Sequence, residues 1–263
     1  MVSINGTNYL VVDEVPKREK KGGCWNKFFV VKDGVIAMSL RDTTILLSLL
    51  LTGSLLTMLG IACKAGTYEC DLMNGEWPMV SDILCLPLFD RVWCILTTWF
   101  CWGVMQVNVR AMYQVFHGII SPQANDWLAF WGVLCIISFP LIGYFDENDY
   151  WIPHITLAAI FFGSTTIYAN RLAHYLHKHQ SEFREEYQGR IKMLYTIGNI
   201  MIGNLVVLAV TWINGWFPAL FEWILAILYI NFFTFASMIN NYYQSVHQVT
   251  HEDDEDEKEP IVA

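Results

Sequence analysis

Apolar residues occur in six long runs along the chain, and a polar segment separates each run from the next. The runs cover residues 44–62, 89–110, 126–145, 152–175, 191–213 and 216–240. A helix needs roughly 20 apolar residues to cross the hydrocarbon core of a bilayer. Soluble helices would carry charges along one face, and these runs carry almost none. The pattern therefore predicts an all-α, polytopic membrane protein with six transmembrane helices, contained in a domain of residues 44–245.

Composition agrees with this prediction, because 54% of the 263 residues are hydrophobic and 16% are charged. Much of the formal net charge of −9 lies in an acidic run near the end of the chain. Like charges in a run repel one another, so residues 246–263 are expected to form a disordered acidic tail. We see no basic surface of the kind that binds nucleic acid, and we expect no nucleic-acid partner.

The distribution of Lys and Arg predicts the orientation in the membrane. Lys64 and Arg91 lie on one side, and the other Lys and Arg residues lie on the side that holds both termini. Both termini are therefore expected in the cytosol, with residues 63–88 forming an exoplasmic loop. Residues 1–43 would be a basic cytosolic arm. Within it, residues 17–32 either contact an anionic leaflet or serve to orient the first span.

Three further patterns concern local structure. Apolar residues 28–31 and 35–38 flank Asp33-Gly34, which is a short hairpin signal. In the fifth apolar run, Gly198-Asn199 and Gly203-Asn204 combine small residues with amides, a pattern that favours close helix approach and hydrogen bonds between helices. The short connection 214–218 forces the last two spans to run antiparallel.

The exoplasmic loop holds Cys63, Cys70 and Cys85, and the compartment it faces permits disulfides. The short separation of Cys63 and Cys70 favours a bridge between these two. The alternative is that all three thiols stay reduced and pack as small apolar groups.

Glu222 lies about one turn inside the sixth run, and a carboxylate within a membrane span either finds a partner or stays protonated. Arg91 begins the second run and His154 the fourth, so both lie at the same exoplasmic depth. The sequence therefore predicts a pocket for a phosphorylated or glycosylated lipid headgroup, made by Arg91, His154 and Glu222. In it Arg91 contacts an anion and His154 is a proton donor or hydrogen-bond partner, with Ser81 and Asp82 at the rim. The alternative is that each side chain faces the interface separately and anchors its helix.

No catalytic residue can be assigned from sequence, because Ser81 lacks the Gly-x-Ser-x-Gly context of a nucleophile elbow. His174, His177 and His179 form a single histidine-rich stretch, which favours a cytosolic helix extension over a metal centre. The acidic segment 146–149 is interpreted as a solvated turn. We therefore expect no metal and no cofactor, and whether the protein is an enzyme stays open.

Several short motifs resemble one family of six-helix membrane proteins. They are Pro78-Met79-Val80-Ser81-Asp82, Pro87, Arg91-Val92-Trp93, Asp149, Ile152 to His154, and Glu222-Trp223. The family contains the damage-regulated autophagy modulators, the yeast suppressor-of-four-kinase protein, and the Golgi factor that acts on GPI-anchored proteins after anchor attachment. The likeness covers about residues 40–245.

Among these branches, the motif of Pro-x-Val-Ser, Pro and Arg-Val-Trp looks most like the GPI-anchor factor. Residues 83–88 depart from the Pro-Pro-Glu-Ser-like run of the other branches, although those branches share Asp82. The resemblance implies lipid remodelling of GPI anchors, as catalyst or accessory, with membrane lipids and GPI-anchored proteins as partners. It implies the Golgi, with the ER, lysosome and plasma membrane left open. A non-enzymatic membrane scaffold or regulator of autophagy is the alternative, and a transporter is a weaker one.

Overall fold

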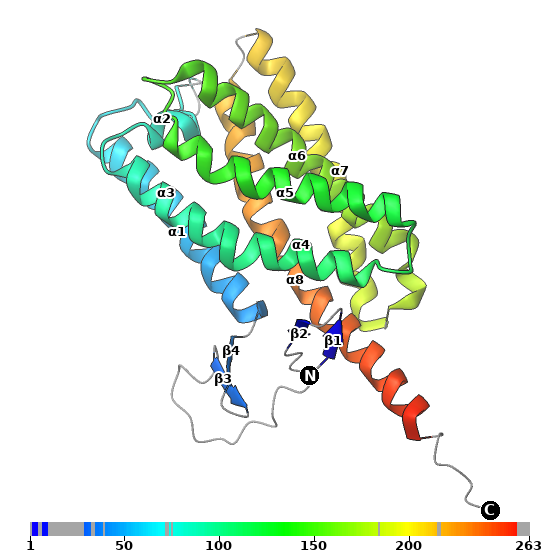
Figure 1. Cartoon of the computed structure of the whole chain (residues 1–263). Helices are drawn as coiled ribbons and strands as arrows, with labels where there is room; N and C mark the ends of the chain where they lie inside the picture. Colours follow the sequence, from blue (N-terminus) through cyan, green and yellow to red (C-terminus); the bar gives the residue numbers. More distant parts are fainter. Residues whose placement is uncertain are drawn as a thin grey trace, which may run out of the picture.

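The computed structural model contains the helices that the apolar runs predict (Figure 1). It describes residues 2–4, 7–9, 29–32, 35–38, 40–71, 74, 76–183, 185–214 and 217–256. Within these residues, six helices are long and apolar enough to cross a membrane: Arg41–Lys64, Phe89–Val115, Pro122–Tyr144, Trp151–Lys178, Tyr187–Asn214 and Pro218–Ile239. The prediction of a helical, multi-span membrane protein is confirmed.

The spans are built from seven helical elements and one π-turn. The second span consists of α3 (Phe89–Phe100), the π-turn η2 (Cys101–Met105) and α4 (Gln106–Val115). The others are α1 (Leu40–Lys64), α5 (Pro122–Tyr144), α6 (Trp151–Lys178), α7 (Glu185–Asn214) and α8 (Pro218–Asp256). Two short helices lie between spans, α2 (Val80–Leu84) and the 3₁₀-helix η3 (Gln180–Glu182). Proline stands at the first position of α5 and α8, where its missing N–H leaves no helical hydrogen bond unmade.

The spans form a closed ring in which each packs against its neighbours in sequence. α1 packs on α3, α3 and α4 on α5, α5 on α6, α6 on α7 and α7 on α8, and α8 then packs back on α1. α8 also contacts α4, so the last span runs through the interior of the bundle (Figure 1). Because successive spans are antiparallel, the N-terminal ends of α6 and α8 lie at the same end of the bundle as α2.

Aromatic side chains fill the centre of this ring. Phe139 of α5 stacks on Phe161 of α6 with ring centroids 4.3 Å apart, and Phe100 of α3 meets Phe233 of α8 edge to face. Large apolar side chains such as Leu49 and Val206 are exposed on the outside of the ring. In a bilayer, lipid replaces the protein neighbours that these outer side chains lack.

The glycines and asparagines of the fifth run contribute to contacts of α7 with α6 and α8. Asn199 of α7 accepts a hydrogen bond from Asn170 of α6 at 3.2 Å, and Asn204 donates to the carbonyl of Phe221 in α8 at 2.8 Å. A Cβ at Gly198 would lie 3.2 Å from the backbone of α6, so glycine allows the close approach. The prediction of close packing and interhelical hydrogen bonds is confirmed.

Strands occur as two hairpins at the N-terminal end. β3 (Phe29–Lys32) pairs with β4 (Val35–Met38) in antiparallel register, as the sequence predicts, while Asp33-Gly34 lies outside the described residues. A second hairpin, β1 (Val2–Ile4) with β2 (Thr7–Tyr9), was not expected. Its signal was the intervening Asn-Gly pair, which favours a tight hairpin turn. Most of the basic segment 17–32 lies outside the described residues.

The disordered acidic tail stays a prediction, and α8 extends into part of it. α8 continues without interruption from the bilayer span to Asp256 and so includes most of the acidic run. Residues 240–256 contain neither Gly nor Pro, and extending an existing helix adds one hydrogen bond per residue without a new nucleation step. Residues 257–263 lie outside the described residues.

Candidate functional site

The segment that leads into α2 is shaped by Asp82. Its carboxylate accepts a hydrogen bond from the backbone N–H of Met79 at 2.8 Å, which satisfies a free donor at the start of this short helix. A negative charge in the first turn also suits the positive end of the helix dipole. The hydroxyl of Tyr68 donates to the backbone carbonyl of Asp82 at 3.0 Å. Asp82 is half-buried and lines neither of the cavities described below.

The cysteines of this loop fall into two chemical states. Cys63 and Cys70, the pair that the sequence favours, form a disulfide that closes the turn after α1. Cys85 is free and half-buried, and its sulfur accepts a hydrogen bond from the backbone N–H of Glu147 at 3.4 Å. Burial raises the pKa of the Cys85 thiol, so the thiol stays protonated and poorly nucleophilic near neutral pH.

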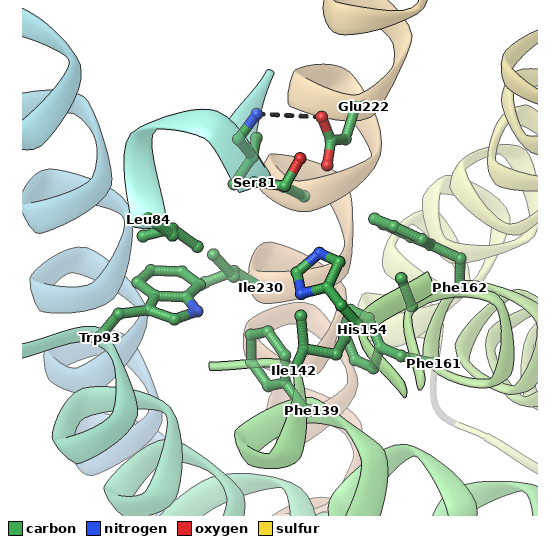
Figure 2. Close-up of a pocket in the computed structure, with 13 residues that line it drawn as sticks. Ser81, Leu84, Trp93, Phe139, Ile142, His154, Phe161, Phe162, Glu222 and Ile230 are labelled. Carbon is green, nitrogen blue, oxygen red and sulfur yellow. Dashed lines mark hydrogen bonds between the residues drawn. The ribbon is translucent and has the colours of Figure 1, made fainter. Parts of the chain in front are cut away.

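Two hydrogen bonds from α8 hold the start of α2, and we call them the loop clamp. The backbone N–H of Val80 donates to Oε2 of Glu222 at 2.9 Å, and the indole N–H of Trp223 donates to the carbonyl of Pro78 at 2.9 Å. Glu222 and Trp223 are both buried. Neighbouring residues of α8 therefore hold the start of α2, and Figure 2 shows the bond to Glu222.

His154 lies in the first turn of α6, and 6% of its surface is exposed. Its Nδ1 lies 2.7 Å from the carbonyl oxygen of Phe145, so Nδ1 carries the proton and donates it. In a neutral imidazole the other nitrogen, Nε2, is then an acceptor. Figure 2 shows the imidazole of His154 between Glu222 and the aromatic side chains of Phe139 and Phe161.

The expected pairing of Glu222 with Arg91 or His154 is not what the structure shows. Glu222 takes the backbone N–H of Val80 as its hydrogen-bond partner, and the Nδ1 of His154 is used by Phe145. Arg91 is exposed and lines neither cavity, because the buried face of α3 carries Trp93, Cys94, Thr97 and Phe100 on its other side. Arg91 lies at the expected depth, but it is on the exposed side of α3 and not on the side that faces the cavities.

Three of the five residues that the sequence selects do come together. Ser81, His154 and Glu222 line two adjoining cavities. The inner cavity holds about 50 Å³ and lies among the aromatic side chains at the centre of the ring (Figure 2). The outer cavity holds about 280 Å³ and lies between α6 and α7. Ser81, His154 and Glu222 form the wall that the two share.

We call the outer cavity the α6–α7 groove. Small side chains make room for it, since Ala158, Ala159 and Gly163 of α6 face Leu208 and Ala209 of α7. Ala159 and Ala209 are exposed, so the groove opens on the outside of the ring. Its lining on α6 runs from residue 155 to residue 163, about 12 Å along the helix axis.

One end of the groove is polar and consists of Ser81, Glu147, His154 and Glu222, which we call the polar end. Among the described residues, no Lys or Arg lines either cavity. Glu147 and Asp82 lie close enough to Glu222 to repel its negative charge. Glu147 was not expected here, because the acidic segment 146–149 has the pattern of a solvated turn. In the structure Oε2 of Glu147 is buried without a hydrogen-bond partner.

The stretch with three histidines extends α6 beyond the apolar span. The ring of His177 stacks on Tyr195 of α7 with centroids 4.4 Å apart, and His179 pairs with Glu182 at 3.0 Å. These contacts give two of the three histidines packing and pairing roles at the other end of the bundle from the polar end.

The comparison with family models gives one match. The model described as the Frag1/DRAM/Sfk1/Cwh43P N-terminal domain matches residues 43–238. This range covers the six spans, apart from the first two residues of the first and the last residue of the sixth, and includes the loop clamp and the polar end. No curated protein and no solved structure matches the chain.

Proposed function

The chain belongs to the Frag1/DRAM/Sfk1/Cwh43P family, and we propose that it binds a membrane lipid during lipid remodelling of GPI anchors. The α6–α7 groove is the observation that carries this proposal. It offers an apolar channel for a hydrocarbon chain and a polar end for a headgroup, and it opens toward the surrounding bilayer. Small-molecule sites share this design of an apolar wall with a few convergent polar groups.

The length of the groove supports a lipid that belongs to one leaflet. About 12 Å of apolar lining is less than half of a hydrocarbon core of about 30 Å. The disulfide between Cys63 and Cys70 lies at the same end of the bundle as the polar end, and disulfides persist in oxidising compartments. Together with the distribution of Lys and Arg, this favours the exoplasmic leaflet of a secretory membrane, with the Golgi as the proposed compartment.

A binding or accessory role fits the polar end better than nucleophilic catalysis. In an acyl-transfer site, an acidic side chain orients the histidine that activates the serine. Here the backbone carbonyl of Phe145 orients His154, and Glu222 accepts from Val80. Among the described residues, no hydrogen bond joins Ser81 to His154. We therefore propose that Ser81 contributes to binding.

Filling the groove tests the proposal. Gly163 lines the groove, and a Cβ added there meets nothing within 4 Å, so the backbone of α6 accepts Gly163→Leu and the added side chain occupies groove space. In cells that lack this protein, the variant should fail to restore GPI-anchored protein at the surface, because the lipid chain has lost its place.

Gly60→Leu provides the matched control. Gly60 is also in a helix, is exposed on α1, and has nothing within 4 Å of an added Cβ. Both changes raise intrinsic helix propensity equally, and of the two positions only Gly163 lines the groove. Gly60→Leu should restore surface GPI-anchored protein. Full activity of Gly163→Leu at equal expression would refute the proposal.

The scaffold alternative makes a different prediction about the end of the chain. A cytosolic scaffold would act through its termini, whereas a lipid site at the polar end does not need them. Deleting residues 246–263 should leave GPI-anchored protein at the surface unchanged. Loss of that protein on deletion would favour the scaffold.

A further inference from the structure

Hydrogen-bond acceptors dominate the polar end of the α6–α7 groove. Glu222 is 94% buried, since 6% of its surface is exposed, and its carboxylate lies on the wall shared by both cavities. Glu147 Oε2 is buried with no hydrogen-bond partner. His154 is equally buried, and its Nδ1 donates to Phe145, so Nε2 is an acceptor whenever the imidazole is neutral.

The described residues that line the groove include no Lys or Arg, so no permanently charged cation stands beside these carboxylates. Arg91 is exposed on α3 and does not line the groove. A carboxylate removed from water is costly unless a cation or a proton neutralises it. The repulsion from Glu147 and Asp82 adds to the cost at Glu222. An anionic phosphate gripped here would be repelled, which argues against the anion contact that the sequence predicts.

A ligand that complements this site carries positive charge and N–H donors. A protonated primary amine has three donors and one charge. Three acceptor groups, Glu147, His154 and Glu222, come from the loop before α6, from α6 and from α8. The adjoining groove accepts an apolar chain, and its opening on the outer surface gives a route of entry from the bilayer.

We propose that the α6–α7 groove binds one chain of a lipid whose headgroup carries a protonated amine, held by Glu147, His154 and Glu222. The inference rests on the proposed lipid-binding function and specifies the class of lipid. Charge-assisted hydrogen bonds from the ammonium to the two carboxylates provide the selectivity. The phosphate of such a lipid would lie outside the polar end, toward the membrane surface.

The test measures lipid binding to the delipidated full-length protein in detergent by native mass spectrometry. The probes are phosphatidylethanolamine, phosphatidylcholine and phosphatidic acid with identical acyl chains. Phosphatidylethanolamine should bind about tenfold more tightly than phosphatidic acid, with phosphatidylcholine between them because its ammonium has charge but no N–H donor. Equal or tighter binding of phosphatidic acid would overturn the inference.

Variants assign the preference to the named residues. Glu147→Gln and Glu222→Gln should each reduce the preference for phosphatidylethanolamine severalfold while leaving binding of phosphatidic acid unchanged or stronger. Gln at position 222 keeps an acceptor oxygen for the N–H of Val80, so the loop clamp survives. Arg91→Ala should leave the preference unchanged. An undiminished preference in both Gln variants would overturn the assignment.

The groove-filling variant separates this inference from the proposed function. Gly163→Leu should weaken binding of all three lipids, because it removes the place of the shared chain. If the protein binds all three lipids equally and Gly163→Leu abolishes that binding, the headgroup inference fails and the lipid-binding function stands. If none of the three lipids binds, both fail.

Discussion

Glu222 combines a structural contact with a place at the polar end, and substitution separates the two. Glu222→Ala removes the acceptor of the Val80 N–H, which is itself buried. An unsatisfied buried donor costs about 1–3 kcal/mol of the free energy of unfolding. For a chain of this size that corresponds to a lower melting temperature by about 2 to 12 °C. Glu222→Gln keeps an acceptor oxygen and removes a charge that Asp82 and Glu147 repel, so its melting temperature should stay close to the wild-type value.

Thermal unfolding in detergent measures this difference, and Cys85 reports the local effect. Its sulfur packs against the segment at Glu147 and is half-buried while the loop clamp holds α2. Alkylation of Cys85 should be slow in the wild type and in Glu222→Gln and clearly faster in Glu222→Ala, with Cys85→Ser as the blank. A Gln variant as destabilised as the Ala variant would refute the reasoning, because the negative charge rather than the acceptor would then stabilise the loop.

Three other outcomes follow from the structure. Because burial raises the pKa of the Cys85 thiol, the pH at which its alkylation rate is half-maximal should lie above that of a free thiol. A half-maximal pH at or below the value of a free thiol would contradict the burial argument. Ser81→Ala should keep most of the GPI-anchored protein at the cell surface. A loss of surface GPI-anchored protein as complete as in Gly163→Leu would indicate nucleophilic catalysis. In sealed microsomes, added protease should remove the tail and spare residues 63–88, and Asn5 should carry no glycan; a glycan there would reverse the orientation.

The spans could be predicted because the length of an apolar run is a local property of the sequence. Each run of about 20 residues became a helix whose ends moved by a few residues. The depth of Glu222 and His154 could be predicted for the same reason. The acidic end of α8 could not, because repulsion between like charges competes with elongation of a helix that the bilayer span has already nucleated.

The position of a residue along a span predicts its depth in the membrane, but not which side of the helix it faces. Arg91 starts its span at the depth of Glu222, yet Trp93, Cys94 and Thr97 define a buried face that excludes it. The helical period of 3.6 residues applied to those apolar neighbours contained this information. Glu147 is harder to predict, because its burial depends on how the turn after α5 folds against α2, which no local pattern determines.

The loop clamp also sets an order of assembly during synthesis. Its two hydrogen bonds join residues separated by 142 and 145 positions, so Pro78 and Val80 emerge from the ribosome long before their partners on α8. At roughly 5–20 residues per second, the loop waits for roughly 7 to 28 s without the contacts that bury it. During that interval α2 is open to the chaperones on its side of the membrane. A nascent chain that stops before α8 would leave this loop unburied, a feature that quality control can recognise.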